Sequence, residues 1–232
     1  MIERYTNPEM GNIWTLQHEF ETMLEVEIAA CEAMAELGEI PQEAAANIRA
    51  KAKFDLPRVK EIEKVTNHDI IAFLTNLEEN VGEDSKYIHK GLTSSDVKDT
   101  AYCVMMRDAA AIILDDLNAF REVLRRRAEE FRHTPCIGRT HGIHAEPMTF
   151  GLKLLLWSAE IERDIERLTR AKEIVSVGKL SGAVGTYSNI DPRIEELTCK
   201  KLGITPVRLA TQVIQRDRHA EFVTTLAIIA GT

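Results

Sequence analysis

The chain has 232 residues, of which 44% are hydrophobic and 28% are charged, and its formal net charge is −8. A chain of this length and apolar content can bury the core of one or two domains. The acidic balance argues against a general nucleic-acid-binding protein, because such proteins gather positive charge to neutralise phosphates. Four widely spaced cysteines without a C-x-x-C pair favour a reducing cytoplasmic environment over a disulfide framework or a zinc site. No stretch is apolar enough to span a bilayer and the N-terminus lacks a signal-peptide pattern, so we expect a cytoplasmic protein with no membrane partner.

The first 92 residues predict a small helical domain. Apolar residues recur there at helical spacing, and Pro and Gly mark the starts and ends of the periodic segments. Four helices are predicted, over 8–37, from Pro41 to about Lys53, from Pro57, and over 69–81.

Residues 93–232 predict the first part of a central bundle of long helices. A helix that starts near Thr93 meets no Gly or Pro until Pro135, which corresponds to roughly 55 Å at 1.5 Å per residue. Its middle, 101–114, is apolar on nearly every face, and a second long helix is predicted over 148–177. Helices that are apolar on all faces are buried on all faces. We therefore expect an all-α fold whose bundle is completed in a homo-oligomer, by further chain, or by both.

The segment 138–150 is the richest in potential chemistry, and we predict it to be a loop between the two long helices. It contains three possible proton carriers, His141, His144 and Glu146, together with the fixed cation Arg139. A metal site is not favoured, because Pro147 prevents the continuous helix on which an H-E-x-x-H zinc motif depends. A single loop histidine is usually structural, but this combination favours proton transfer.

Two shorter segments each allow two interpretations. Arg4 and Tyr5 could together bind a phosphate, or could belong to a solvated terminus. In the segment 66–69, Asn67 or Asp69 could cap the following helix, or the neighbouring carboxylate could hold His68 in one tautomer for a substrate.

The segment from His89 to Asp96 precedes the first long helix. Hydroxyls at Thr93 and Ser94, with the free N–H groups of a helix start, favour binding of a carboxylate or phosphate; the alternative is an ordinary N-cap. The Gly-rich segment 178–189 matches neither a P-loop nor a dinucleotide-binding turn.

Six segments in order carry a family resemblance: Arg4-Tyr5, 66–73, 91–101, 138–147, 181–185 and 211–219. In this combination the whole length of the chain resembles the adenylosuccinate lyase family of the fumarase/aspartase superfamily. The resemblance implies β-elimination of fumarate from adenylosuccinate, giving AMP, and from succinylaminoimidazole carboxamide ribotide in purine biosynthesis. It implies no metal or other cofactor, and it implies a homotetramer whose active sites are shared between subunits.

The resemblance also implies roles for individual residues. His141 would be the general acid toward the leaving nitrogen, His68 would assist it, and His89 would lie near the substrate phosphate. The remaining implied contacts with the nucleotide substrate are Arg4, Tyr5, Asn67, Asp69, Thr93, Ser94 and Gln212.

One family feature is missing from the sequence. The catalytic base of the family is a serine in a Ser-Ser-x-Met-Pro-x-Lys-x-Asn loop, which does not occur here, and family members are nearly twice as long. We interpret the chain as an N-terminal portion that does not turn over substrate by itself. The alternatives are another lyase of the superfamily, such as argininosuccinate lyase, and a non-catalytic helical scaffold. A scaffold would need none of His68, His89 and His141.

Overall fold

The computed structural model describes residues 2–232. Helices account for 68% of the structure and strands for 7%, so the prediction of a mainly helical fold is confirmed. Contacts divide the chain into two compact units, one formed by residues up to 107 with 176–215, and the other by 108–175 with 216–232. No helix in the described part of the chain is long and apolar enough to cross a membrane.

The first unit is built around α2 (Leu16–Glu36), most of whose residues from Phe20 to Ala35 are buried. Three phenylalanines, Phe20, Phe54 and Phe73, pack with ring centroids 5.3 to 5.8 Å apart in its core. The other elements of this unit are η1 (Glu3–Tyr5), α1 (Pro8–Ile13), α3 (Gln42–Lys51), α4 (Leu56–Thr66), α5 (Asp69–Val81), η2 (Glu83–Tyr87), the beginning of α6 (Ser94–Glu130), β3 (Val177–Gly178), α8 (Pro192–Leu202) and β4 (Thr205–Pro206).

The predicted single helix over 8–37 is wrong in one respect, because the structure divides it into α1 and α2. The interruption lies at Trp14 and Thr15, and the Thr15 hydroxyl accepts a hydrogen bond from the N–H of His18 at 3.1 Å. A threonine that caps a new helix in this way competes with continuation of the previous one.

The segment 176–215 returns to the N-terminal helices. In it, α8 packs on α2, β3 pairs with β4 in parallel, and Leu180, Ile190 and Ile194 join the core of the first unit. The sequence does not predict this return, because the packing partners are more than a hundred residues away along the chain. The predicted division of the chain into an N-terminal domain, 1–92, and a first part of a bundle domain, 93–232, stays a prediction.

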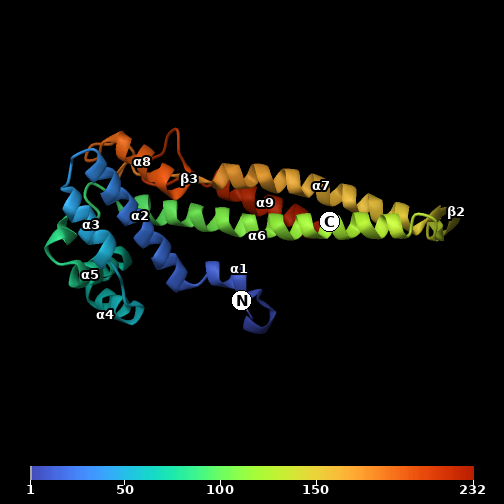
Figure 1. The fold of residues 1–232 in the computed structure, drawn as a ribbon, viewed down its shortest axis with the longest axis horizontal. Helices are drawn as coiled ribbons and strands as arrows, with labels where there is room; N and C mark the ends of the chain where they lie inside the picture. The colour runs from blue at the N-terminus through green and yellow to red at the C-terminus, as the bar shows by residue number, and fades with distance from the viewer. Residues whose placement is uncertain (1) are drawn as a thin grey trace. The chain divides into compact units, whose positions relative to one another are not determined.

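The second unit contains most of α6, α7 (Phe150–Val175) and α9 (Asp217–Gly231). In it, α6 and α7 are connected by a hairpin of β1 (Pro135–Thr140) and β2 (Ile143–Thr149), and α9 packs against α7 (Figure 1). An ion pair between Arg125 and Glu162, 3.2 Å apart, links the two long helices.

The prediction that 138–150 is a loop is wrong, because this segment forms most of the antiparallel hairpin and the first residue of α7. Its turn residues His141 and Gly142 both have positive φ angles, 51° and 75°, between the paired residues Thr140 and Ile143. Two successive positive φ angles are the signature of the two-residue turn whose twist matches that of paired strands. Both faces of the hairpin are largely exposed, so the segment lacks the apolar alternation by which strands are recognised in a sequence.

Gly91 and Gly38 allow a matched test of close packing in the first unit. Both have φ of +77°, but a Cβ at Gly91 would lie 2.2 Å from the backbone oxygen of Asn189, whereas a Cβ at Gly38 would meet no atom within 4 Å. Gly38→Ala should therefore lower the free energy of unfolding by about 1 kcal/mol through strain alone. We expect Gly91→Ala to lower it by a further ~1–3 kcal/mol, because the carbonyl must move. Urea denaturation of both variants measures the difference, and equal losses would contradict the close approach.

Candidate functional site

The turn between α4 and α5 carries three of the predicted site residues. Asn67 ends α4 with φ of 51°, a left-handed conformation that Asn tolerates better than most residues. His68 is the N-cap of α5, and its Nδ1 accepts a hydrogen bond from the N–H of Ile71 at 3.4 Å. Helix capping is therefore realised here, with His68 rather than Asn67 or Asp69 as the cap. The contact leaves the proton of a neutral His68 ring on Nε2, and the exposed side chain can offer it to a ligand.

Asp69 connects this turn to the beginning of α6. Its Oδ2 lies 2.5 Å from Nζ of Lys98, and its Oδ1 lies 3.5 Å from Nδ1 of His68. Partial burial raises the pKa of Asp69, but hydrogen bonds from Lys98 and from the N–H of Ile70 outweigh burial and lower the pKa below its ordinary value. Asp69 is therefore held as a carboxylate beside His68.

The start of α6 is organised by Asp96, whose side chain is fully buried. Its carboxylate accepts hydrogen bonds from the N–H groups of Thr93 at 2.9 Å, Ser181 at 3.2 Å and Gly182 at 3.1 Å. It also pairs with the ammonium group of Lys179, which is itself fully buried and donates to the carbonyl of Gly182 at 2.8 Å. The half-buried Thr93 and Ser94 are therefore held against the Gly-rich loop.

The next turn of α6 fixes two further segments. The Thr100 hydroxyl donates to the carbonyl of Lys179 at 3.1 Å and accepts from its N–H at 3.0 Å. Asp99 accepts a hydrogen bond from the N–H of Ile214 at 2.8 Å. The exposed predicted site residue Gln212 belongs to this loop, so the contact brings its segment to α6.

His89 is held by Glu27 of α2. The carboxylate of Glu27 accepts from the backbone N–H of His89 at 3.0 Å and lies 2.5 Å from its ring Nδ1. Burial lowers the pKa of His89, but the hydrogen bond and charge of Glu27, together with the charge of Asp96, outweigh burial and raise that pKa. His89 is therefore suited to carry a positive charge near neutral pH.

Arg4 and Tyr5 lie in η1 in the first unit, and both are exposed. The guanidinium carbon of Arg4 lies 4.8 Å from the centroid of the Tyr5 ring, a cation–π distance. The two side chains form a pair, and η1 belongs to the same unit as the beginning of α6 and the segments that contact it.

His141 belongs to the second unit, unlike the other predicted site residues. It occupies the turn of the hairpin and is exposed, as are His144, Arg139 and Glu146. Arg139 and His144 are opposite each other in the strand register. The hairpin therefore presents His141 at its tip, where the turn fixes the backbone.

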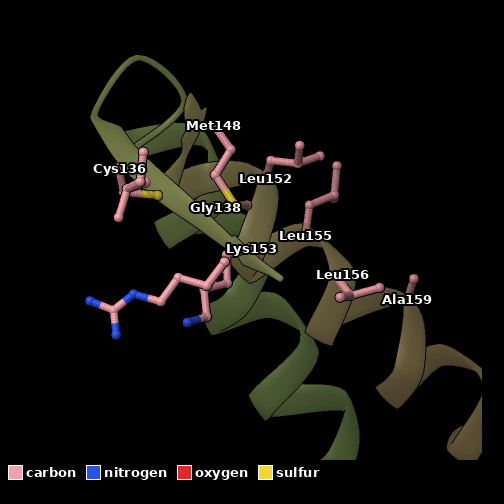
Figure 2. Close-up of a pocket in the computed structure, with 10 residues that line it drawn as sticks. Cys136, Gly138, Met148, Leu152, Lys153, Leu155, Leu156 and Ala159 are labelled. Carbon is pink, nitrogen blue, oxygen red and sulfur yellow. The ribbon is translucent and has the colours of Figure 1, made fainter. Parts of the chain in front are cut away.

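A groove of about 880 Å³ lies at the base of the hairpin (Figure 2). Side chains of Met148, Leu152, Leu155 and Leu156 lie along the strand and α7 in this region (Figure 2). The three leucines are each more than 50% exposed. Contiguous exposed apolar surface of this kind usually marks a surface that another chain segment covers.

Sequence analysis missed the charged partners of the site, which are the partly exposed Lys98 and the buried Glu27, Lys179 and Glu195. Glu195 is 3% exposed, and it accepts hydrogen bonds from the N–H of Leu180 at 2.6 Å and from the Tyr187 hydroxyl at 2.8 Å. One signal was available for Glu27, because it falls on the apolar stripe of α2. A charged residue on a buried helix face requires a partner, but the sequence does not identify that partner.

Lys179 and Lys98 provide a matched test of the buried ion pair. Both pair with an aspartate, but the Lys179–Asp96 pair is fully buried and both side chains of the Lys98–Asp69 pair are 41% exposed. Lys179→Met should lower the free energy of unfolding by about 3–5 kcal/mol, because it leaves a buried carboxylate unpaired. Lys98→Met should lower it by only about 0–1 kcal/mol. Denaturant titration measures both, and losses of equal size would refute the organising role of Asp96.

The raised pKa of His89 predicts a pH-dependent stability. A histidine whose pKa is higher in the folded state contributes stability that is fully present below its unfolded pKa of about 6.5 and is lost as pH rises through the folded pKa. His89→Asn removes this titration and retains a residue that tolerates the left-handed backbone. Urea unfolding at several pH values should show the largest difference between wild type and variant below about pH 6.5. A difference that grows with rising pH would contradict the raised pKa.

Comparison with known proteins shows that the chain is similar in sequence to lyases over nearly its whole length. A family model described as "Lyase" matches residues 3–232. The adenylosuccinate lyase of Synechocystis sp. is 55% identical over 232 residues, covering 100% of this chain and 54% of that protein. The adenylosuccinate lyase of Bacillus subtilis is 52% identical over 230 residues, covering 99% of this chain and 53% of that protein. The chain thus spans about half the length of the curated relatives it matches.

Solved structures agree in fold. A fumarate lyase from Mesorhizobium sp. BNC1 superposes with a TM-score of 0.90 at 31% identity, covering 97% of this chain and 54% of that one. The β-carboxy-cis,cis-muconate cycloisomerase of Acinetobacter calcoaceticus has a TM-score of 0.88 at 30% identity, covering 97% and 55%. The family match over residues 3–232 shows that the chain belongs to the lyase family of the fumarase/aspartase superfamily.

Proposed function

We propose that this chain supplies part of an adenylosuccinate lyase, which eliminates fumarate from adenylosuccinate to give AMP and acts likewise on succinylaminoimidazole carboxamide ribotide. The observation that carries this proposal is the 50–55% identity to three adenylosuccinate lyases over at least 99% of the chain. The geometry of the first unit is compatible with the reaction, because this unit contains the exposed His68 and a helix N-terminus that suits anionic groups.

The reaction removes a proton from carbon, stabilises a dianionic carboxylate and protonates the leaving nitrogen. We assign protonation of the nitrogen to His141, which the hairpin turn exposes. His68 would assist through its Nε2–H, whose position follows from the contact of Nδ1 with the backbone. Acid–base side chains and hydrogen-bond donors suffice for this scheme, and it includes no cofactor.

We assign the binding of the nucleotide substrate to the first unit. His89, with the Arg4 and Tyr5 pair, would contact the phosphate, because these side chains combine positive charge with hydrogen-bond donors. Thr93 and Ser94, at the N-terminus of the 37-residue α6, would hold a substrate carboxylate. The further contacts with nucleotide and succinyl groups would come from Asn67, Asp69 and Gln212.

We also propose assembly into a homotetramer with shared active sites. The groove at the hairpin and the exposed leucines of α7 support this proposal, since such surface is normally covered in the functional assembly. The curated relatives are about twice as long as this chain. The base that removes the carbon-bound proton would come from the part of the enzyme that corresponds to the rest of their length.

The test is release of fumarate from adenylosuccinate, followed by absorbance. We would compare the 232-residue chain with a form continued by the remaining residues of the Bacillus subtilis relative. We expect turnover by the continued form alone, and a fall in kcat of roughly 10²–10⁴-fold on His141→Ala. His133→Ala, which removes another exposed histidine outside the proposed site, should leave turnover unchanged.

Each contrary outcome addresses a different part of the proposal. Turnover by the 232-residue chain itself would contradict the location of the base. Undiminished turnover in His141→Ala would contradict the role of His141. Cleavage of argininosuccinate instead would assign the chain to another lyase activity, and a folded continued form inactive on both substrates would favour a scaffold.

A further inference from the structure

Glu27 is a carboxylate in the core of the first unit. It lies on α2 and is 1% exposed, among buried apolar residues such as Met23, Cys31 and Met34. An ionised carboxylate in such surroundings is unfavourable unless it is paired and hydrogen-bonded. Glu27 meets this requirement through one residue, His89, which contributes both a backbone N–H and a ring nitrogen.

The two contacts together fix the orientation of His89. Its φ of 63° is a left-handed conformation that costs energy for a residue with a side chain, so the surrounding contacts must maintain it. With Nδ1 directed at Glu27 Oε1, the other ring nitrogen, Nε2, is the one that a ligand can approach. The side chain of His89 is 16% exposed, so it is not sealed from a ligand.

The direction of the Nδ1 proton decides what Nε2 can bind. If Nδ1 donates to Glu27, a neutral ring presents a bare acceptor at Nε2, whereas a protonated ring presents a donor with a positive charge. A buried carboxylate in direct contact favours the protonated ring. The complementary ligand group is therefore an anion that accepts hydrogen bonds, such as a phosphate or a sulfate.

We propose that Glu27 is a positioning residue that holds His89 as a cationic hydrogen-bond donor, with Nε2 directed to an anionic group of the ligand. The identification of that group as the substrate phosphate rests on the proposed function. The inference that the chain has an anion site that depends on Glu27 does not rest on the proposed function.

The other charged groups near this pair do not replace Glu27. Asp96 of α6 acts on His89 electrostatically, but its carboxylate is paired with Lys179. Lys90, the next residue after His89, faces Glu39 at 4.0 Å. Burial, with the charges of Glu27 and Glu32, raises the pKa of the Cys31 thiol far above its ordinary value, so Cys31 adds no negative charge.

Glu32 provides a matched control on the same helix. Its carboxylate pairs with Arg49 at 2.8 Å and with Lys201 at 3.6 Å, and its side chain is 29% exposed. Glu32→Gln removes one negative charge from α2, as Glu27→Gln does, but leaves the partner of His89 in place. Both substitutions nearly preserve side-chain shape, and two-dimensional NMR spectra verify that each variant is folded.

The experiment measures the dissociation constant for sulfate through the His89 ring signal in NMR spectra, which His89→Asn assigns by its loss. Sulfate is chosen because its charge stays constant across the pH range studied. Glu27→Gln should weaken sulfate binding about tenfold near neutral pH, which corresponds to the loss of one charge-assisted contact. Binding should be lost as rising pH deprotonates His89. In Glu27→Gln this loss should occur at a lower pH than in the wild type, because the protonated ring of His89 is less stable without Glu27. Glu32→Gln should change neither quantity.

A double variant separates positioning from a general effect on the fold. In the His89→Asn background, where binding is followed by calorimetry, Glu27→Gln should cause no further loss of sulfate affinity. An equal loss in both backgrounds, an unchanged pH profile in Glu27→Gln, or no sulfate binding by the wild type would each overturn the inference. If the sulfate results hold but the continued form releases no fumarate, the positioning role stands and the proposed function fails.

Discussion

The side chains of Asp96 and Lys179 have no exposure to solvent, and removing two charges from water costs several kcal/mol for each ion unless close pairing and further hydrogen bonds compensate. The structure provides that compensation through three backbone N–H groups on Asp96 and a carbonyl on Lys179. The arrangement is satisfied only when the start of α6 and the loop 179–182 are in their observed places. The pair therefore specifies a single packing of these segments, and the candidate residues Thr93 and Ser94 depend on it.

The position of the pair at the beginning of a helix extends its effect. Asp96 lies in the first turn of α6, where a negative charge complements the helix dipole and the unpaired N–H groups. Successive residues of a helix point about 100° apart, so residues close in sequence contact different neighbours. Lys98 reaches the turn after α4, Asp99 reaches the loop of Gln212, and Thr100 reaches the backbone of Lys179. The first two turns of α6 thus connect most of the candidate substrate-binding segments of the first unit.

Local features of the sequence predict much of this fold, and long-range contacts account for most of what they miss. The bounds of α5 follow from apolar spacing that ends at Gly82, and they agree with the helix predicted over 69–81. The hairpin was missed because its strands have no buried face. The pairs Glu27–His89 and Asp96–Lys179 join residues 62 and 83 positions apart, and a sequence shows that a buried charge needs a partner without showing which one.

Backbone conformation adds a separate constraint on the candidate site. Four non-glycine residues in the described chain have positive φ, and three of them, Asn67, His89 and His141, carry proposed roles. Such conformations persist only where the surroundings determine them. The Glu27 carboxylate contacts both the backbone N–H and the ring Nδ1 of His89, and the paired strands around Gly142 fix the turn at His141. The rings of His89 and His141 are therefore each presented from a backbone position with positive φ that surrounding contacts hold in place. A site that must hold proton donors and an anion in fixed geometry benefits from this rigidity, because the ordering cost is met in folding rather than at binding.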